Sequence, residues 1–338
     1  MMMWPAWGMP LTLLLVLLLA LWIDHRFGEP PLAIHPVVWM GRYLQMCGHI
    51  NVRCPPVPAF VLGALAWCVG ALGVGAAAWQ VQSFVDWLWG RAASLEFRMT
   101  WSTLSLGLGC ALLLAWLLKT MLSWRMLRDE AGAVETALRQ SLDAGRQRLS
   151  WLVSRETENL SESEVRESVI ETLAENLNDS VVAPIFWFVL FGLPGAAVYR
   201  FANTADAMWG YRGVYRGQHW EWAGKWAAWA DDALSWLPAR LTALLLMLVT
   251  GNFRLGTLRR EAARTPSPNS GWPMAAMALA LGISLSKPGV YTLNPDGRAP
   301  QAADTALAKK YALKVMVVLV LWALIAIVLI AISVSSFL

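Results

Sequence analysis

The sequence predicts an all-α polytopic integral membrane protein. We expect about four to six membrane helices, a long amphipathic cytosolic helical segment, and re-entrant or interrupted helices around a polar cavity. Composition is the first reason, because 57% of the 338 residues are hydrophobic and only 15% are charged, whereas soluble domains carry about 25% charged residues. The 21 tryptophans are the second reason, because indole rings favour the interface between bilayer and water.

Long apolar runs are the third reason. A helix needs roughly 20 apolar residues to cross the hydrocarbon core of a bilayer. Four runs meet this requirement: 8–23, 58–79, 101–118 and 313–334. Two further runs are ambiguous: 180–199, which contains Pro184 and the sequence GLPG, and 233–250, which contains Pro238 and Arg240. We favour an arrangement in which neither of these two spans the membrane, or in which they are partly re-entrant, so that the loop 200–232 faces the cytosol.

Basic residues indicate the orientation. The first ten residues carry no Lys or Arg, whereas segments 119–178 and 252–312 are rich in both. Because Lys and Arg gather on the cytoplasmic side, we expect an outside N-terminus and a cytosolic location for these segments. The chain is interpreted as a single domain in four parts: N-terminal membrane helices 1–118, a polar helical segment 119–179, a motif-rich segment 180–312 and a C-terminal membrane helix 313–338.

Charge and cysteine content limit the classes of partner. The net charge of +4 is too small to indicate a nucleic-acid partner. The four cysteines show no zinc-ligand spacing and no disulfide framework. There is no G-x-x-x-x-G-K-[ST] phosphate loop, so any nucleotide must bind at a non-standard site.

An acidic segment covers residues 155–179, which hold eight of the 23 acidic residues. At about 100° per residue, its acids fall on one arc of a helix and its apolar residues on the opposite arc. The acidic arc contains Glu164, Glu167, Glu171 and Glu175, and Asn178 joins it. Two interpretations stay open for this arc: a solvated outer face, or a Mg²⁺ site in which carboxylates hold a metal that also binds substrate phosphates.

Three other segments carry polar side chains beside apolar runs. In YRFANTADAMWGYRGVYRG (199–217), arginines either anchor the chain at the interface or bind phosphates and carboxylates. The adjacent acids Asp231 and Asp232 lie at a membrane edge, where acids indicate function. In the loop 23–42, His35 is either structural or a ligand. The segment 268–282 is either a re-entrant lining of a site or a core helix.

Five blocks of sequence carry a resemblance to a known family. The blocks are DHRFGEPPLAIHPVVWMGR, LVSRETENLSESEVRESVIETLAENLNDSVVAPIFW, YRFANTADAMWGYR, DDALSWLPARLTALL and SPNSGWPMAAMALALG, in that order. The chain resembles, over nearly its whole length, the adenosylcobinamide-phosphate synthase family (CobD/CbiB), integral membrane enzymes of cobalamin biosynthesis. It departs from the usual family pattern in four places: Glu29 and Glu156 stand where Asp is usual, Ser180 where Gly is usual after Asp179, and Ser235 where Asn is usual.

The resemblance implies an amide-forming ligase in the cell inner membrane, with several membrane passes and an active site that faces the cytosol. The implied reaction joins (R)-1-amino-2-propanol, or its O-phosphate, to a propionate of adenosylcobyric acid, with ATP as co-substrate and Mg²⁺ as cofactor. These substrates and the lipid bilayer are the expected partners. Homo-oligomers and association with other late cobalamin-assembly enzymes both stay open.

The resemblance also assigns candidate residues. The expected catalytic residues are Glu171, Glu175, Asp179, Asp206, Asp231 and Asp232, and the first three are also the expected metal ligands. The expected substrate-binding residues are Asp24, His35, Arg155, Thr157, Asn176, Asn203, Tyr211, Arg212, Arg216 and Asn269. Two alternatives to the enzyme remain: a membrane sensor or regulator of the related AmpE-like branch, and a transporter of corrinoid or amine.

Overall fold

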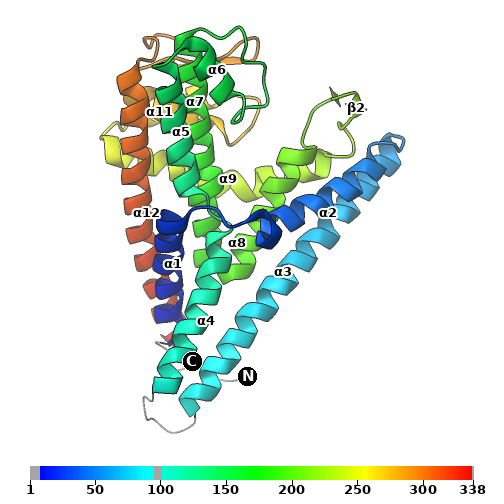
Figure 1. Ribbon diagram of the computed structural model, residues 1–338, viewed down its shortest axis with the longest axis vertical. Coiled ribbons are helices and arrows are strands. Elements are labelled where there is room, and N and C mark those ends of the chain that lie inside the picture. The colour runs from blue at the N-terminus through cyan, green and yellow to red at the C-terminus, as the bar shows by residue number, and fades with distance from the viewer. Residues whose placement is uncertain (1–7, 95–100, 337–338) are drawn as a thin grey trace. The chain divides into compact units, whose positions relative to one another are not determined.

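The computed structural model describes residues 8–94 and 101–336, and helices dominate them (Figure 1). The first half contains α1 Gly8–Phe27, the short 3₁₀ helix η1 Leu32–Ile34, α2 Pro36–Asn51, α3 Pro56–Ser94, α4 Trp101–Lys119, α5 Trp124–Leu138, α6 Leu142–Leu149 and α7 Glu162–Leu177. The second half contains a π-helical turn η2 Asn178–Val182, α8 Ala183–Trp209, α9 Lys225–Thr250, α10 Leu255–Ala262, α11 Gly271–Leu281 and α12 Ala302–Ser336.

Two short antiparallel hairpins interrupt the helices. β1 Val214–Tyr215 pairs with β2 Gln218–His219, and β3 Leu285–Lys287 pairs with β4 Tyr291–Leu293. Both hairpins turn through glycines with positive φ, Gly217 at 74° and Gly289 at 74°, a conformation that glycine adopts without steric cost.

The chain folds into two compact units whose segments alternate along the sequence. Unit 1 takes the described residues of Met1–Ser123, Pro184–Leu234 and Trp322–Leu338. Unit 2 takes Trp124–Ala183 and Ser235–Leu321. In unit 1, α1 packs along α4 and α2 packs along α3. In unit 2, α7 is central, because α5, α6, α11 and β3 all pack against it.

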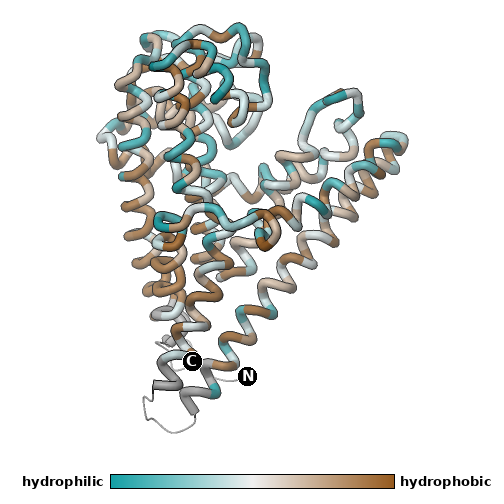
Figure 2. The backbone as a smooth tube through the Cα atoms, in the orientation of Figure 1, coloured by the Kyte–Doolittle hydropathy of each residue, from teal (hydrophilic) through white to brown (hydrophobic). Residues whose placement is uncertain are grey.

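Within the described residues, four helical stretches are long and apolar enough to cross a membrane: Pro56–Leu88, Glu162–Trp209, Lys225–Thr250 and Ala302–Ile330. A fifth results if Ser105–Lys119 and Trp124–Leu138, which are bent by 42°, form one span. Figure 2 shows apolar residues along α12 and hydrophilic residues in the loop that carries β1 and β2. The predicted all-α polytopic membrane protein is therefore confirmed.

The two ambiguous runs, 180–199 and 233–250, both lie in helices of spanning length. Length and composition do not decide whether they cross the membrane, so the cytosolic position of the loop 200–232 stays a prediction. The two outermost of the four clear runs, 8–23 and 313–334, lie in α1 and α12.

α8 is interrupted at the GLPG sequence. Gly192 has φ 66° and ψ −154°, and Pro194 follows within the same helix. The backbone N–H of Leu193 donates to Oε1 of Gln82 in α3 at 2.8 Å. A Cβ at Gly192 would lie 2.5 Å from that same oxygen, so both the backbone angle and the close approach require glycine.

Candidate active site

Most of the acidic segment forms α7, and Glu164 of the acidic arc helps to cap the N-terminus of this helix. Ser161 and Glu164 make a capping box: the Ser161 side chain accepts from the Glu164 N–H, and Glu164 Oε2 accepts from the Ser161 N–H at 2.7 Å. This arrangement satisfies backbone donors that a helix start leaves unpaired. Glu164 therefore belongs to the helix cap rather than to a site.

Two further acids of the acidic arc, Glu167 and Glu171, are buried. The apolar arc of α7 forms core, with Val165, Val169 and Leu173 at most 2% exposed. On the acidic arc, Glu167 is 8% exposed and Glu171 is 4% exposed. The interpretation of this arc as a solvated outer face is therefore wrong for these two acids, because other elements of unit 2 cover them.

Arg155 forms an ion pair with Glu171, a buried acid of the acidic arc. Its Nη2 donates to Glu171 Oε2 at 2.8 Å and to Ser168 Oγ at 2.6 Å. Oε1 of Glu171 is buried and accepts no well-formed hydrogen bond from the described residues. Glu167 is satisfied differently: its Oε2 accepts from the backbone N–H of Ser286 in β3 at 2.9 Å.

A polar pocket of about 170 Å³ opens beside this ion pair. Its lining residues are Leu152, Val153, Ser154, Arg155, Glu171, Thr172, Glu175, Asn176, Lys287 and Tyr291. Four predicted site residues meet here: Arg155, Glu171, Glu175 and Asn176. The pocket thus places two cationic side chains and two carboxylates around one small volume.

Lys287 and Tyr291 are site residues that sequence reasoning missed. They are directly paired across the β3–β4 hairpin, so their side chains lie on the same face of it. Burial, followed by the negative charges of Glu171 and Glu175, raises the pKa of Tyr291. The Tyr291 hydroxyl therefore keeps its proton beside the two carboxylates. The Pro-Gly turn in LSKPGVYTL is the signal that could have indicated this hairpin.

Asp179 lies outside this pocket, in the π-helical turn η2. Asn178 Nδ2 donates to Asp179 Oδ1 at 2.8 Å, and Thr242 Oγ1 of α9 lies 3.0 Å from Asn178 Oδ1. Asn178 and Thr242 are both buried, at 2% and 0% exposure. The Thr242 hydroxyl also lies 2.9 Å from the Pro238 carbonyl, so its proton is shared between this carbonyl and the amide that orients Asp179.

Replacing Thr242 by valine is expected to lower the free energy of unfolding by about 1–3 kcal/mol, because the buried Asn178 oxygen loses its partner. Thr242→Ser keeps the hydroxyl and is the matched control, with a smaller loss. The measurement is the unfolding midpoint of both variants in the same detergent. Equal midpoints for the valine and serine variants would show that this hydrogen bond does not stabilise the fold.

A second polar cluster lies in unit 1 and joins three segments. Lys119 Nζ lies 2.8 Å from Glu29 Oε2 and 3.3 Å from Asp24 Oδ1. Lys119 and Asp24 are 1% and 0% exposed. His35 Nδ1 accepts from the Val37 N–H at 3.3 Å, so the neutral ring carries its proton on Nε2 and donates it to Glu29 Oε2 at 3.2 Å. The predicted Asp24 and His35 do converge here, and Lys119 is the member that the sequence did not reveal.

Acid is expected to weaken this cluster. Burial alone would raise the pKa of Glu29, but hydrogen bonds from His35 and Lys119 and the charge of Lys119 hold its pKa below the ordinary 4.5. A carboxyl group with a depressed folded-state pKa stabilises the fold above its unfolded pKa and loses that contribution as pH falls through the folded pKa. The unfolding midpoints of the unaltered protein and Glu29→Gln should therefore differ at neutral pH and converge below pH 4.5. A constant difference across that range would contradict the assignment.

A third group of predicted residues occupies the loop around β1 and β2. The rings of Tyr211 and Tyr215 stack at 3.7 Å, and the Arg216 guanidinium lies 5.2 Å from the Tyr215 ring. Burial and the neighbouring Tyr215 raise the pKa of Tyr211 to about 12. Arg212 is close enough to act electrostatically on Asp232.

The other predicted residues are placed as follows. Asn203 and Asp206 lie on α8, Asp231 lies on α9, and Thr157 is buried in the loop before α7. Asn269 Oδ1 accepts from Arg240 Nη1 at 2.8 Å, which makes Asn269 a partner of Arg240 rather than a lining residue of the small pocket. The predicted residues therefore form separate groups within the two units.

Known proteins are similar to this chain over most of its length. The family described as "CobD/Cbib protein" matches residues 17–319. The chain belongs to the CobD/CbiB family. A "Probable cobalamin biosynthesis protein CobD" of Methanothermobacter thermautotrophicus is 38% identical over 288 residues, which cover 82% of this chain and 86% of that protein. A "Cobalamin biosynthesis protein CobD" of Chromobacterium violaceum is 38% identical over 276 residues, 80% of each chain. No solved structure matches.

Two departures of this CobD/CbiB family member from the usual pattern can be located. Glu29 contacts Lys119 and His35, so a carboxylate at this position is used within unit 1. Glu156 is exposed and does not line the small polar pocket. The longer side chain at position 156 therefore leaves the lining of that pocket unchanged.

Among residues 8–94 and 101–336, no group of three or more His, Cys, Asp or Glu side chains is placed to hold a metal ion. A Mg²⁺ ion does not require such a group, because it is commonly held by one or two carboxylates together with substrate phosphates and water. The assignment of Glu171, Glu175 and Asp179 as metal ligands stays a prediction, and of the three only Glu171 and Glu175 line one pocket.

Proposed function

We propose that this protein is an amide-forming ligase of cobalamin biosynthesis. In this proposal it joins (R)-1-amino-2-propanol, or its O-phosphate, to a propionate of adenosylcobyric acid at the expense of ATP. Family membership and the names of the relatives support a role in cobalamin biosynthesis. The observation that carries the chemical part is the polar pocket, in which Arg155 and Lys287 lie beside the carboxylates of Glu171 and Glu175.

The reaction needs a carboxylate to become reactive toward an amine. In the proposed route, a propionate oxygen attacks the γ-phosphorus of ATP, the bond from that phosphorus to the bridging oxygen breaks, and ADP leaves, which gives an acyl phosphate. The amine nitrogen then attacks the carbonyl carbon, the bond between that carbon and the phosphate oxygen breaks, and phosphate leaves with the electron pair. The amine loses a proton to a base as the amide forms.

The pocket residues fit these needs. Arg155 and Lys287 would neutralise phosphate oxygens, since guanidinium and ammonium groups are the usual phosphate partners in proteins. Glu175 is our first choice for the base that accepts the proton of the amine. The Tyr291 hydroxyl, which keeps its proton, can donate a hydrogen bond to an oxygen of the substrate.

Mg²⁺ would be held by Glu171 together with substrate phosphates, because Glu171 Oε1 is a buried carboxylate oxygen without a well-formed hydrogen bond from the described residues. Bound Mg²⁺ would neutralise charge on the phosphates. Arg155 already donates to the other oxygen of Glu171 at 2.8 Å, so Oε1 is the oxygen that would contact the metal. We also propose that the protein lies in the cytoplasmic membrane with this pocket on the cytosolic side.

The test is an assay of the purified protein in detergent with adenosylcobyric acid, ATP and Mg²⁺, and with the free amine and its O-phosphate in separate reactions. Formation of adenosylcobinamide or its phosphate, detected by chromatography and mass spectrometry, is the expected result. Reactions without ATP and without Mg²⁺ are the controls. The absence of any amide product with both amines would overturn the proposal and would favour the sensor or transporter.

A further inference from the structure

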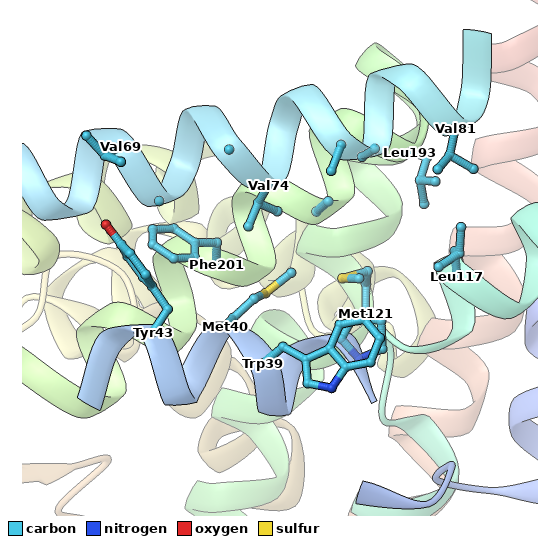
Figure 3. Close-up of a pocket in the computed structure, with 16 residues that line it drawn as sticks. Trp39, Met40, Tyr43, Val69, Val74, Val81, Leu117, Met121, Leu193 and Phe201 are labelled. Carbon is cyan, nitrogen blue, oxygen red and sulfur yellow. The ribbon is translucent and has the colours of Figure 1, made fainter. Parts of the chain in front are cut away.

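An apolar groove of about 580 Å³ lies in unit 1 between α2, α3, α8 and the end of α4 (Figure 3). Figure 3 shows Val69 and Val74 of α3 on one side, and Met40 and Trp39 of α2 on the other. Its volume falls within the roughly 300–1,000 Å³ of small-molecule sites. It is separate from the small polar pocket, which lies in unit 2.

The lining offers no polar group to a ligand. Two lining side chains carry hydrogen-bond donors, and both donors are used. Tyr43 Oη donates to the Ala66 carbonyl at 2.8 Å, and Trp39 Nε1 donates to the Ala33 carbonyl at 3.0 Å. A polar ligand group in the groove would lose its hydrogen bonds to water without replacement, which is unfavourable. A ligand that suits this lining is therefore a hydrocarbon.

The surroundings of the groove supply such a ligand. Its α3 and α8 walls belong to stretches of spanning length, Pro56–Leu88 and Glu162–Trp209. Val69 at one end of the groove is 61% exposed. In a chain that spans a membrane, the medium next to such helices is made of lipid acyl chains.

An extended peptide does not suit this lining. It would bring backbone N–H and C=O groups that the lining cannot satisfy, and such groups cost several kcal/mol each in an apolar medium. A hydrocarbon chain carries no such groups.

We propose that this groove is a binding site for a single acyl chain of a membrane phospholipid. The chain lies along α3, where Gly73 contributes no side chain. A Cβ at Gly73 would meet no atom within 4 Å, so a larger side chain there would extend into the groove without a clash. The proposal is independent of the ligase reaction.

The experiment uses the full-length protein in vesicles of phosphatidylethanolamine and phosphatidylglycerol, with a trace of phospholipid that carries a diazirine midway along one acyl chain. After irradiation, adducts are mapped by mass spectrometry. Met40 and Leu72 distinguish groove from bulk lipid, because Met40 is 7% exposed and Leu72 is 73% exposed. An acyl chain in the groove gives an adduct on Met40, and bulk lipid labels Leu72.

Two variants complete the experiment. Gly73→Leu fills the groove and should abolish the Met40 adduct while Leu72 labelling persists. Gly109→Leu is the matched control, because Gly109 also lies in a helix with no atom within 4 Å of its Cβ and does not line the groove. Both substitutions replace glycine by a better helix former, so folding should tolerate both.

Three outcomes would overturn the proposal. The first is labelling of Leu72 without labelling of Met40 in the unaltered protein, which needs no variant at all. The second is a Met40 adduct that persists in Gly73→Leu. The third is protection of Met40 by a second copy of the chain, seen as a dimer cross-linked by a thiol-reactive linker through Cys47 of α2 or Cys68 of α3.

Discussion

Replacing Lys119 by methionine is expected to lower the free energy of unfolding by about 3–5 kcal/mol, because removal of one partner from a buried ion pair leaves the other charge uncompensated. Lys119 Nζ lies within 3.3 Å of a carboxylate oxygen of both Asp24 and Glu29. Asp24 is 0% exposed, so water cannot replace the lost ammonium. The measurement is the unfolding midpoint, or a denaturant titration, in detergent micelles.

Two further variants separate charge from packing. Lys310→Met removes an exposed lysine of α12 and should change stability by less than about 0.5 kcal/mol. The triple variant Lys119→Met, Asp24→Asn, Glu29→Gln removes the stranded charges and should recover part of the loss. A loss in Lys119→Met no larger than in Lys310→Met would contradict the view that this lysine holds the cluster together.

Replacing Glu175 by glutamine is expected to lower the rate of amide formation by about 10²–10⁴-fold, the usual contribution of a general base. The amide side chain keeps the size of the carboxylate and one of its acceptor oxygens, but it cannot accept the proton of the amine. The measurement is kcat with the purified protein and saturating substrates.

Glu158→Gln is the matched control, because Glu158 is an exposed acid in the loop before α7 and does not line the pocket. Its rate should equal that of the unaltered protein, and the unfolding midpoints of both variants should be unchanged. If Glu175→Gln kept the full rate, Glu175 would not be the base, and Asp206, Asp231 and Asp232 would become the next candidates.

Local periodicity explains what the sequence could predict about α7. The 3.6-residue spacing placed the valines and leucines on one side and the acids on the other, and the structure has this arrangement. The same spacing also predicted that Asn178 lies on the acidic arc, but the α-helical pattern does not extend to this residue. The α-helix ends at Leu177 and a π-helical turn follows, in which Asn178 contacts Thr242, 64 residues later in the chain. A contact so distant in sequence leaves no local pattern.

Sequence reasoning missed Lys119, Lys287 and Tyr291 for the same reason, because their partners lie far away in the sequence. Lys119 is an isolated basic residue at the end of an apolar run, and only the packing of α4 along α1 brings it to Asp24. Lys287 and Tyr291 reach the polar pocket because β3 packs against α7. Acids that crowd into one stretch are visible in a sequence, whereas their cationic partners become visible only when distant segments meet.

The hydrogen bond between Gln82 and the broken helix α8 bears on how the protein is made. Chains fold from the N-terminus during synthesis, so α3 emerges from the ribosome well before Gly192. The freed N–H of Leu193 is costly in lipid unless a partner is already present, and Gln82 is that partner at 2.8 Å. Because α3 is synthesised before α8, Gln82 is available to accept from the Leu193 N–H as soon as the broken helix forms.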